Sequence, residues 1–382
     1  MKIAYVQAFY LPAIDGPATV IHEIASRLAK KGHEVHVFCS DSDKHKKIKQ
    51  KEEVLDGVKI HRLNNWFQIG FATFFPSVFL KLMKEDFDII HSHVSGHSYH
   101  FFSSLVRMIK KTPHVHTTHC CWTSGLGRSK LSAFLVWLDY KTVLPFSFYY
   151  SDRIIAITPW ELDEIAKYNS NKNKVTVIPN GMDSVLLKKI NNNDFRKSYG
   201  IPEDVKLVLF FGRLNPTKGV DKLAEAAVSI TSARKDIHFA FVGPDEGMMN
   251  KVIEISKGNS NIHIMGPIRG KDKIAAMFQA SDLYALPSYR EGLPLTMFEA
   301  MASGLPIVAS PVNGIPYEMK EPENGLFVKY GDVEGLKKAI LKILDNPKFA
   351  KEIRANNLEK AKAYDWDIIA EKTLKVYESV LP

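Results

Sequence analysis

Short apolar runs alternate with amphipathic stretches along most of the chain. The runs have the length and composition of buried strands, and the stretches between them place apolar residues at helical spacing. In the first half, this pattern predicts strands at residues 2–8, 34–38, 58–63, 87–91, 114–118, 152–157 and 174–178. A helix predicted at 19–31 joins the first two strands, and such a strand–helix–strand unit implies a parallel sheet.

The alternation stops at a turn cluster, residues 179–183, and then begins again. The second half predicts strands at 206–211, 238–242, 262–265, 282–286 and 307–309, and helices at 220–233, 271–280, 333–344, 347–364 and 366–381. We therefore expect an α/β protein with two Rossmann-like, doubly wound domains facing across a cleft. The first comprises residues 1–180 with the C-terminal helix at about 366–382, and the second residues 181–365. The cleft is the expected site.

Composition narrows the class of protein. The 382 residues are 45% hydrophobic and 24% charged, as in soluble globular proteins. Two of the three cysteines are adjacent, so no disulfide framework is expected, and a reducing cytoplasm is the default location. The N-terminus has the pattern of a core strand rather than a signal peptide, and no apolar stretch is long enough to span a bilayer.

The formal net charge is +9, which suits an anionic substrate or an anionic membrane surface. Basic and aromatic residues are not interleaved, so nucleic acid is not expected as a partner. Two aromatic stretches, residues 66–75 and 134–150, are interpreted as amphipathic helices packed on the sheet. The alternative is a lipid-facing surface near an acceptor site, which would place the protein at the cytoplasmic face of a membrane.

Residues 288–310 carry the first chemical signal. The loop that follows the strand at 282–286 contains Glu291, and a short helix beginning near Pro294 and stopping at Gly304 contains Glu299. The free N–H groups at the start of this helix form an anion site. A negatively charged ligand group with neighbouring hydroxyl groups would fit there.

A second signal directly follows the strand at 206–211. Gly212 permits a close approach of a ligand, and Arg213 and Lys218 bring two cations to the same strand end. Such a pair suits a diphosphate, because arginine forms forked hydrogen bonds and lysine provides a point charge. No GxGxxG or GxxxxGK[ST] motif follows a strand, which argues against dinucleotide dehydrogenases and P-loop NTPases.

Together these residues resemble the family-4-like retaining glycosyltransferases of the GT-B fold. The resemblance includes Gly212-Arg-Leu with Lys218-Gly219, the turn at 178–183, Glu291 and Glu299 as the E-x7-E element, His119 after two threonines, and Asn313-Gly-Ile-Pro316 with Glu318. The features occur in the family's order over essentially the whole chain. One departure is Asp15-Gly16-Pro17, where the family often has two adjacent glycines.

The resemblance implies a role for each matching residue. The second domain would bind a UDP- or GDP-linked sugar through Gly212, Arg213, Lys218, Glu291, Gly292, Leu293, Pro294, Leu295, Thr296 and Glu299. Of these, Glu299 would accept hydrogen bonds from the ribose and Glu291 would hold hydroxyls of the sugar. The first domain would bind the acceptor, an acceptor sugar or a lipid-linked acceptor, with Gly16 and His93 on that side. His119, Arg213, Lys218 and Glu291 would be the catalytic group.

The implied reaction transfers a hexosyl group with retention at the anomeric carbon and requires no cofactor and no dedicated general base. Three alternatives stay open. Glu291 and Glu299 could be a glycosidase acid/base pair, although two cations and an anion site suit a phosphate leaving group better. A nucleotide-sugar 2-epimerase shares the fold type. A nucleotide-sugar-binding protein without activity is the third.

The first half is rich in histidine. This set could form a zinc site, but no acidic or cysteine partner has helix-type spacing, so no metal is expected. The residues concerned are His91, His93, His97, His100, His114, His116 and His119.

Overall fold

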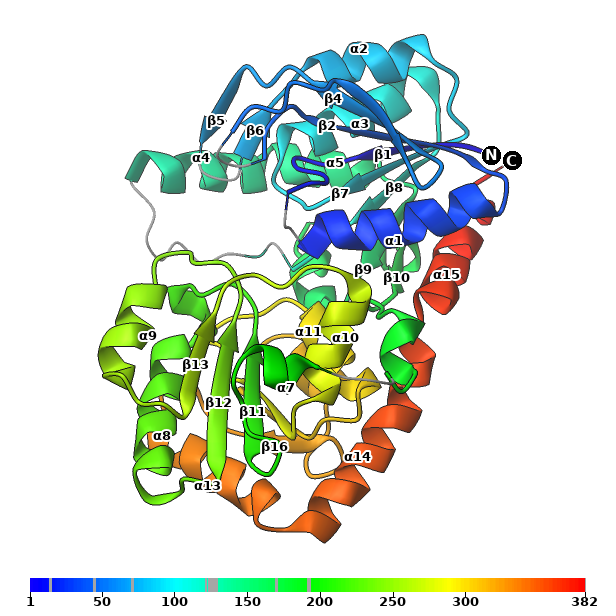
Figure 1. The fold of residues 1–382 in the computed structure, drawn as a ribbon. Coiled ribbons are helices and arrows are strands. Elements are labelled where there is room, and N and C mark those ends of the chain that lie inside the picture. The colour runs from blue at the N-terminus through cyan, green and yellow to red at the C-terminus, as the bar shows by residue number, and fades with distance from the viewer. Residues whose placement is uncertain are drawn as a thin grey trace. The chain divides into compact units, whose positions relative to one another are not determined.

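The computed structural model describes residues 1–13, 16–43, 46–69, 72–120, 122, 130–168, 171–190 and 194–381 (Figure 1). The chain divides into two compact units. Unit 1 consists of Met1–Asn180 and Trp366–Pro382, and unit 2 of Gly181–Asp365. Each unit is built on a mainly parallel sheet covered by helices, as the alternating sequence pattern predicts.

Unit 1 is built on an eight-stranded sheet in the order β10-β9-β8-β7-β1-β2-β4-β3. All neighbouring strands are parallel except β3, which pairs antiparallel with β4 at the edge. The strands are β1 (Lys2–Val6), β2 (Glu34–Ser40), β3 (Glu52–Leu55), β4 (Val58–Leu63), β7 (Ile89–His93), β8 (His114–Thr117), β9 (Arg153–Ala156) and β10 (Val175–Val177). A separate hairpin pairs β5 (Phe67–Ile69) with β6 (Ala72–Phe74).

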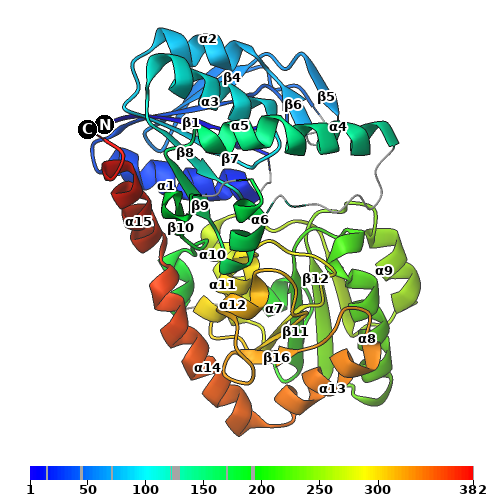
Figure 2. The ribbon, with the colours of Figure 1, turned by 180° about the vertical axis from the view of Figure 1, so that it is seen from behind.

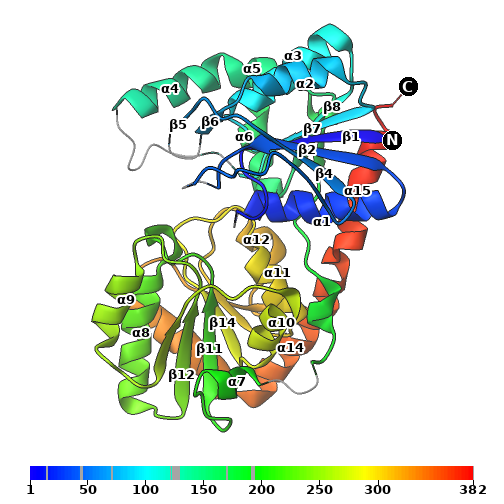
Figure 3. The same cartoon turned by 45° about the horizontal axis from the view of Figure 1, so that its top comes forward.

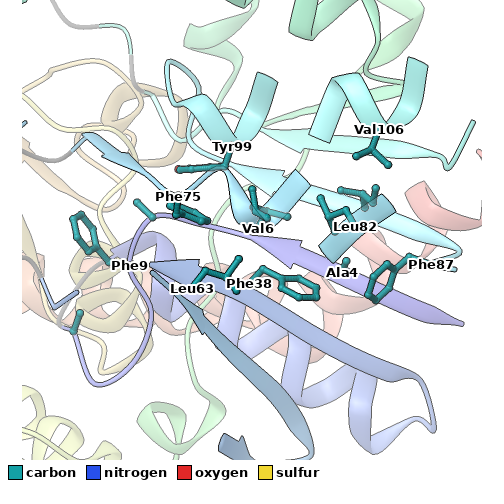
Figure 4. Packing of buried hydrophobic residues seen from close by; sticks show 14 residues of the cluster. Ala4, Val6, Phe9, Phe38, Leu63, Phe75, Leu82, Phe87, Tyr99 and Val106 are labelled. Atoms are coloured by element: carbon teal, nitrogen blue, oxygen red, sulfur yellow. The ribbon is translucent and has the colours of Figure 1, made fainter. Parts of the chain in front are cut away.

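Helices cover both faces of this sheet (Figure 1). They are α1 (Gly16–Lys30), α2 (Ser77–Lys84), α3 (Ser98–Lys110), α4 (Lys130–Lys141), α5 (Val143–Tyr149), α6 (Leu162–Ala166) and α15 (Trp366–Glu378). One core cluster of the unit lies between the sheet and the pair α2 and α3, where Val6, Phe38 and Tyr99 are buried together (Figure 4). Removing this apolar surface from water is the main stabilising contribution.

Unit 2 has a six-stranded, wholly parallel sheet in the order β13-β12-β11-β14-β15-β16. Its strands are β11 (Lys206–Phe211), β12 (Ile237–Val242), β13 (Ile262–Met265), β14 (Leu283–Leu286), β15 (Ile307–Ala309) and β16 (Gly325–Phe327). Its helices are α7 (Phe195–Ser198), α8 (Val220–Ala233), α9 (Met249–Ser256), α10 (Lys271–Gln279), α11 (Leu295–Ala302), α12 (Ile315–Glu318), α13 (Val333–Leu344) and α14 (Pro347–Ala361). Figure 3 shows α8 and α9 on one side of the sheet and α10 and α11 on the other.

The strand order of unit 2, counted along the chain, is 3-2-1-4-5-6, the order of a Rossmann fold. Unit 1 has the same reversal, because β2 lies on one side of β1 and β7 on the other. The prediction of two Rossmann-like, doubly wound α/β domains is confirmed.

The two aromatic stretches differ from what the sequence indicates. Residues 66–75 do not form a packed helix but include the hairpin β5–β6, with Trp66 and Phe67 exposed at 66% and 55%. Residues 134–150 are helical, in α4 and α5, which follow one another along unit 1 (Figure 2). However, α4 leaves Phe134, Trp137 and Leu138 exposed, so the prediction that this stretch packs on the sheet is wrong for these residues. It holds for Tyr140 and for Phe148 of α5, which pack in a buried cluster.

Candidate active site

The predicted donor-binding residues lie at the topological switch point of unit 2. The chain leaves β11 towards α8 and leaves β14 towards α11, and these two helices cover opposite faces of the sheet (Figure 3). In open parallel sheets, ligands bind beyond the carboxyl ends of the strands at this point. Gly212, Arg213 and Lys218 follow β11, and residues 291–296 follow β14. Two segments some 70 residues apart in sequence therefore meet at one sheet edge.

Gly219 fixes the contact between these two loops. Its φ of +64° lies in the left-handed region, and a Cβ atom there would be 2.1 Å from the carbonyl oxygen of Pro287. Beside it, the backbone N–H of Tyr289 donates to the carbonyl of Thr217 at 2.8 Å. Only glycine permits this approach, and the approach places Lys218 next to the loop after β14.

Lys218 and Glu291 form an ion pair in this position. The Nζ atom of Lys218 donates to Oε1 of Glu291 at 2.7 Å and to Oε2 at 2.8 Å. Both side chains are largely buried, at 15% and 6% exposure. Ser288 also donates from Oγ to Oε1 of Glu291 at 2.6 Å, and the side-chain amide of Asn313 donates to the Glu291 carbonyl. The carboxylate is therefore held by Lys218 and Ser288, as a buried charge requires, and Asn313 holds the backbone of the same residue.

Arg213 forms a more exposed pair. Its Nη1 atom lies 2.9 Å and 3.2 Å from the two carboxylate oxygens of Glu246, which also accepts from the amide of Asn215 at 3.1 Å. Its side chain is 38% exposed. Since exposed ion pairs contribute little to stability, the guanidinium can exchange Glu246 for another anion at small cost.

Helix α11 begins beside these groups. Pro294 is the N-cap of this helix, whereas the sequence predicted it in the first helical turn, one position later. No side chain caps the helix. The first turn, Leu295 and Thr296 included, contains no acidic residue. Its N–H groups and the positive end of the helix dipole therefore favour an anion. The Thr296 Oγ1 atom is bonded to the Tyr284 hydroxyl at 2.7 Å, and Glu299 lies one turn further along the helix, half-buried.

In unit 1, the structure brings two predicted residues together. His93 ends β7 and His119 follows β8, and the Nδ1 atom of His93 is hydrogen-bonded to Nε2 of His119 at 2.8 Å. Burial lowers the pKa of His119 to about 3 and the pKa of His93 well below its usual value, so both rings are neutral. His119 and Cys120 both have positive φ, 58° and 52°, a strained conformation often found at functional sites.

Gly16 differs from its prediction. It is the first residue of α1 and not part of a flexible glycine loop. Pro17 follows in the first turn, where its missing N–H is not needed. Asp15, which precedes Gly16, lies outside the described residues. The helix therefore begins three residues before its predicted start at residue 19, and the assignment of Gly16 to the acceptor side stays a prediction.

Three of the histidines could come close to one metal ion. The ring nitrogens of His100, His114 and His116 lie within 4.8 Å of one another, and all three side chains are buried. However, both nitrogens of His116 are bonded to serine hydroxyls, Ser92 and Ser95, each at 2.8 Å. The rings of His100 and His116 also stack face to face at 3.5 Å, so their in-plane lone pairs run parallel and do not converge on one ion. This geometry favours a hydrogen-bonded core over a metal site.

Comparison with known proteins identifies the family. Residues 191–360 match the family model of "Glycosyl transferases group 1", and residues 14–185 match that of "Glycosyltransferase Family 4". An uncharacterized glycosyltransferase of Methanocaldococcus jannaschii is 28% identical over 99% of this chain and 98% of its own length. The chain belongs to the family-4-like glycosyltransferases of the GT-B fold. Its two units correspond to the two matched families.

Two further similarities span this glycosyltransferase. A D-inositol 3-phosphate glycosyltransferase of Thermomonospora curvata is 24% identical over 95% of this chain and 90% of its own length. The crystal structure of the Anabaena protein HepE in complex with UDP superposes with a TM-score of 0.79 at 18% identity, covering 99% of this chain and all of that one. At this identity, the second similarity supports the fold alone. None of the helices in the described parts of the glycosyltransferase has the length and hydropathy needed to cross a bilayer.

Sequence reasoning missed Glu246 and Ser288, which hold Arg213 and Glu291. Glu246 lies four residues after the end of β12, the strand next to β11. An acidic residue near this strand end was the only sequence feature that could have indicated a partner for Arg213. Ser288 directly follows Pro287 in the same loop as Glu291, and its hydroxyl was the only sequence signal. Neither signal distinguishes a partner in the site from an ordinary surface residue.

Proposed function

We propose that this glycosyltransferase moves a hexosyl group from a UDP- or GDP-linked sugar to an acceptor hydroxyl, with retention at the anomeric carbon. The observation that carries the proposal is the arrangement at the switch point of unit 2. There Lys218 contacts Glu291 directly, and Arg213 and the uncapped start of α11 follow the same two strands. A cation pair and a helix N-terminus suit a diphosphate leaving group. The complex of HepE with UDP shows that a protein of this fold binds such a group.

In the proposed mechanism, the protein positions the reactants and stabilises charge. Arg213 and Lys218 bind the diphosphate and offset the negative charge that develops as it leaves. When Lys218 turns to phosphate, Glu291 is released to accept hydrogen bonds from hydroxyls of the donor sugar. Glu299 receives the ribose hydroxyls, and the backbone N–H groups of residues 292–295 bind sugar and phosphate oxygens.

Retention follows if the acceptor attacks the face from which the diphosphate departs. A phosphate oxygen then takes the acceptor proton, so no side chain is needed as general base. Neutral His119 is assigned the task of positioning the donor sugar, since its lowered pKa prevents it from competing as a cation for the phosphates. The two cationic side chains supply the positive charge, and the proposal requires no metal or other cofactor.

For the acceptor, we propose a lipid-linked hydroxyl compound at the cytoplasmic face of a membrane, reached by peripheral binding. The exposed aromatic residues of α4 and the β5–β6 hairpin, together with the net charge of +9, support this choice. The name of the Thermomonospora curvata relative favours a second acceptor class, a soluble sugar or polyol phosphate. Co-sedimentation with anionic vesicles at low and high salt separates the two, because only the first requires membrane binding.

A donor screen tests the reaction itself. The protein is incubated with UDP-glucose, UDP-N-acetylglucosamine or GDP-mannose, with and without D-inositol 3-phosphate or a lipid extract, and products are read by mass. Turnover that depends on the acceptor supports transfer, and the anomeric configuration of the product tests retention. Isomerised donor without acceptor would instead indicate the 2-epimerase. Binding without turnover across the panel would indicate a protein that only binds nucleotide sugars.

A further inference from the structure

A carboxyl oxygen lies buried beside the loop that follows β7. The Oδ2 atom of Asp139, on α4, is buried and accepts no hydrogen bond from the described residues. It lies 3.5 Å from the position that a Cβ atom would take on Gly96. Burial raises the pKa of Asp139 to about 6, so the group still carries a charge at neutral pH. An unpaired buried oxygen on a charged group is costly and uncommon.

Two nitrogen atoms in and beside the same loop are also buried without a hydrogen-bond partner among the described residues. The Nε2 atom of His93 and the Nδ1 atom of His97 are buried, and neither has a hydrogen-bond partner among the residues that the structure describes. His93 is fully buried, and the bond from its Nδ1 to His119 fixes the orientation of its ring. A ligand with several hydroxyl groups can both donate to a carboxylate and pair with an imidazole nitrogen. Such a ligand would satisfy these atoms.

The backbone between the two histidines is held in an unusual conformation. Val94 has a φ of +66°, in the left-handed region that β-branched residues avoid, and Gly96 has a φ of +80°. The N–H of Val94 donates to the carbonyl of Thr117 at 2.9 Å, which ties the loop to the end of β8. Strain that is maintained in this way is common at ligand-binding sites.

Helix α4 has an exposed apolar side and a half-buried side. Phe134, Trp137 and Leu138 are exposed, whereas Asp139 and Tyr140 are half-buried. Tyr140 packs edge-on against Trp122, at 6.4 Å between ring centroids. Asp139 is thus on the inner side of a helix whose outer side is apolar, at the carboxyl end of the unit 1 sheet.

We propose that Asp139, together with His93, binds a hydroxyl group of the acceptor, a sugar or a polyol headgroup. The inference rests on the proposed transferase function. The Asp139 carboxylate accepts a hydrogen bond from the acceptor hydroxyl, and His93 holds a neighbouring hydroxyl through Nε2. Asp139 orients the acceptor and takes no part in the departure of the diphosphate, so donor binding does not depend on it.

The first test needs no acceptor. We compare the Tm of wild type and Asp139→Asn at pH 8, with Asp163→Asn, an exposed acid on α6, as the matched control. Removing a buried charge that lacks a protein partner should raise Tm by about 2–4 °C in a unit of this size, and the control should not change it. A lower Tm for Asp139→Asn would show that the carboxylate serves the fold, and would overturn the proposal.

The second test measures function. UDP affinity and transfer from UDP-glucose to D-inositol 3-phosphate, and to vesicles containing phosphatidylinositol, are compared for the same three proteins. We expect Asp139→Asn to keep wild-type UDP affinity and to raise the acceptor KM at least tenfold. A change of this size corresponds to the loss of about one charge-assisted hydrogen bond. An unchanged KM overturns the proposal even if Tm rises. Absence of UDP and GDP binding in the wild type would instead refute the proposed function, and the Tm comparison stands whichever acceptor is used.

Discussion

The ammonium group of Lys218 lies 2.7 Å and 2.8 Å from the two carboxylate oxygens of Glu291, across two loops that follow neighbouring strands. The pair is largely buried, and Ser288 supports the carboxylate from the other side. In this arrangement each charge compensates the other. The same arrangement allows a diphosphate to replace Glu291 as the partner of Lys218, so the ion pair links the stability of the site to ligand binding.

Replacing only Lys218 should therefore destabilise the protein. Lys218→Met leaves the Glu291 carboxylate buried without its cation, and we expect a loss of about 3–5 kcal/mol in the free energy of unfolding, measured in urea. The double variant Lys218→Met/Glu291→Leu removes both charges and should recover most of that loss. It should still fail to bind UDP or GDP, because the cation is absent.

Lys222→Met is the control for this series. Lys222 pairs with Glu225 at 2.8 Å on the surface of α8, where an ion pair contributes at most about 1 kcal/mol. Equal effects of Lys218→Met and Lys222→Met would contradict a compensating role for the buried pair.

Arg213 should matter for binding and little for stability. Its pair with Glu246 is half-exposed, so Arg213→Ala should change the free energy of unfolding by less than about 1 kcal/mol. Losing the charged hydrogen bonds to a diphosphate should weaken UDP or GDP binding by about 1.5–3 kcal/mol, roughly 10- to 150-fold, as measured by calorimetry.

Arg234 offers a matched comparison for Arg213. Its side chain is 36% exposed and paired with Asp236 and Asp345 in the same unit, and it belongs to neither predicted loop. Arg234→Ala should leave nucleotide affinity unchanged. Unaltered affinity in Arg213→Ala would remove Arg213 from the donor site.

Gly219 should tolerate no side chain. Gly219→Ala places a Cβ atom 2.1 Å from the Pro287 carbonyl oxygen and so forces apart the loops that carry Lys218 and Glu291. Gly258→Ala isolates the backbone contribution, because Gly258 has a similar φ of +71° and no atom within 4 Å of the position that a Cβ would take. We expect about 1 kcal/mol of destabilisation for Gly258→Ala, and a larger loss with weakened UDP binding for Gly219→Ala. Similar losses in both would show that the loop contact is not critical.

The fold could be predicted from sequence to the extent that strands were buried on both faces. Such strands read as continuous apolar runs, and the bounds of β11, β13, α8 and α13 agree with the prediction. The antiparallel β3 and the β5–β6 hairpin were not predicted, because short, half-exposed strands do not form a continuous apolar run. The aromatic residues 66–75 were misinterpreted for the same reason, since apolar residues more often indicate a core than an exposed hairpin.

The candidate site was predictable only in part. The strand ends indicated that Arg213, Lys218 and Glu291 belong to one region, since parallel strands end at the same edge. Which acid meets which cation depends on side-chain positions and on the Gly219 contact, and these have no sequence signature. The unpaired oxygen of Asp139 is likewise invisible in sequence, because the helical pattern of α4 shows an acid among apolar residues without showing what lies beside it.

The buried histidines should make unit 1 sensitive to acid. Burial lowers the pKa of all seven histidines between residues 91 and 119 below the usual value near 6.5, to about 4 for His97 and about 3 for His114 and His119. The other four are His91, His93, His100 and His116. Below pH 6.5 the unfolded chain binds more protons at these positions than the folded one. Stability is therefore retained above pH 6.5 and falls as the pH drops towards 4, by up to about 1.4 kcal/mol per pH unit for each histidine.

Tryptophan fluorescence can follow this loss in unit 1 alone, because all five tryptophans, at positions 66, 122, 137, 160 and 366, belong to it. Burial raises the pKa values of Asp139 and Glu161, which opposes the trend. These two groups stand against the seven histidines and against His33 and His36, whose pKa values burial also lowers. Urea unfolding at pH 7.5 and pH 5 should show a clear decrease at pH 5. Replacing His114, which Ser92 contacts at 2.8 Å, with Gln should reduce the pH dependence by removing one titrating group while keeping a hydrogen-bonding side chain. Equal stability at both pH values would mean that the folded unit accommodates protonated histidines.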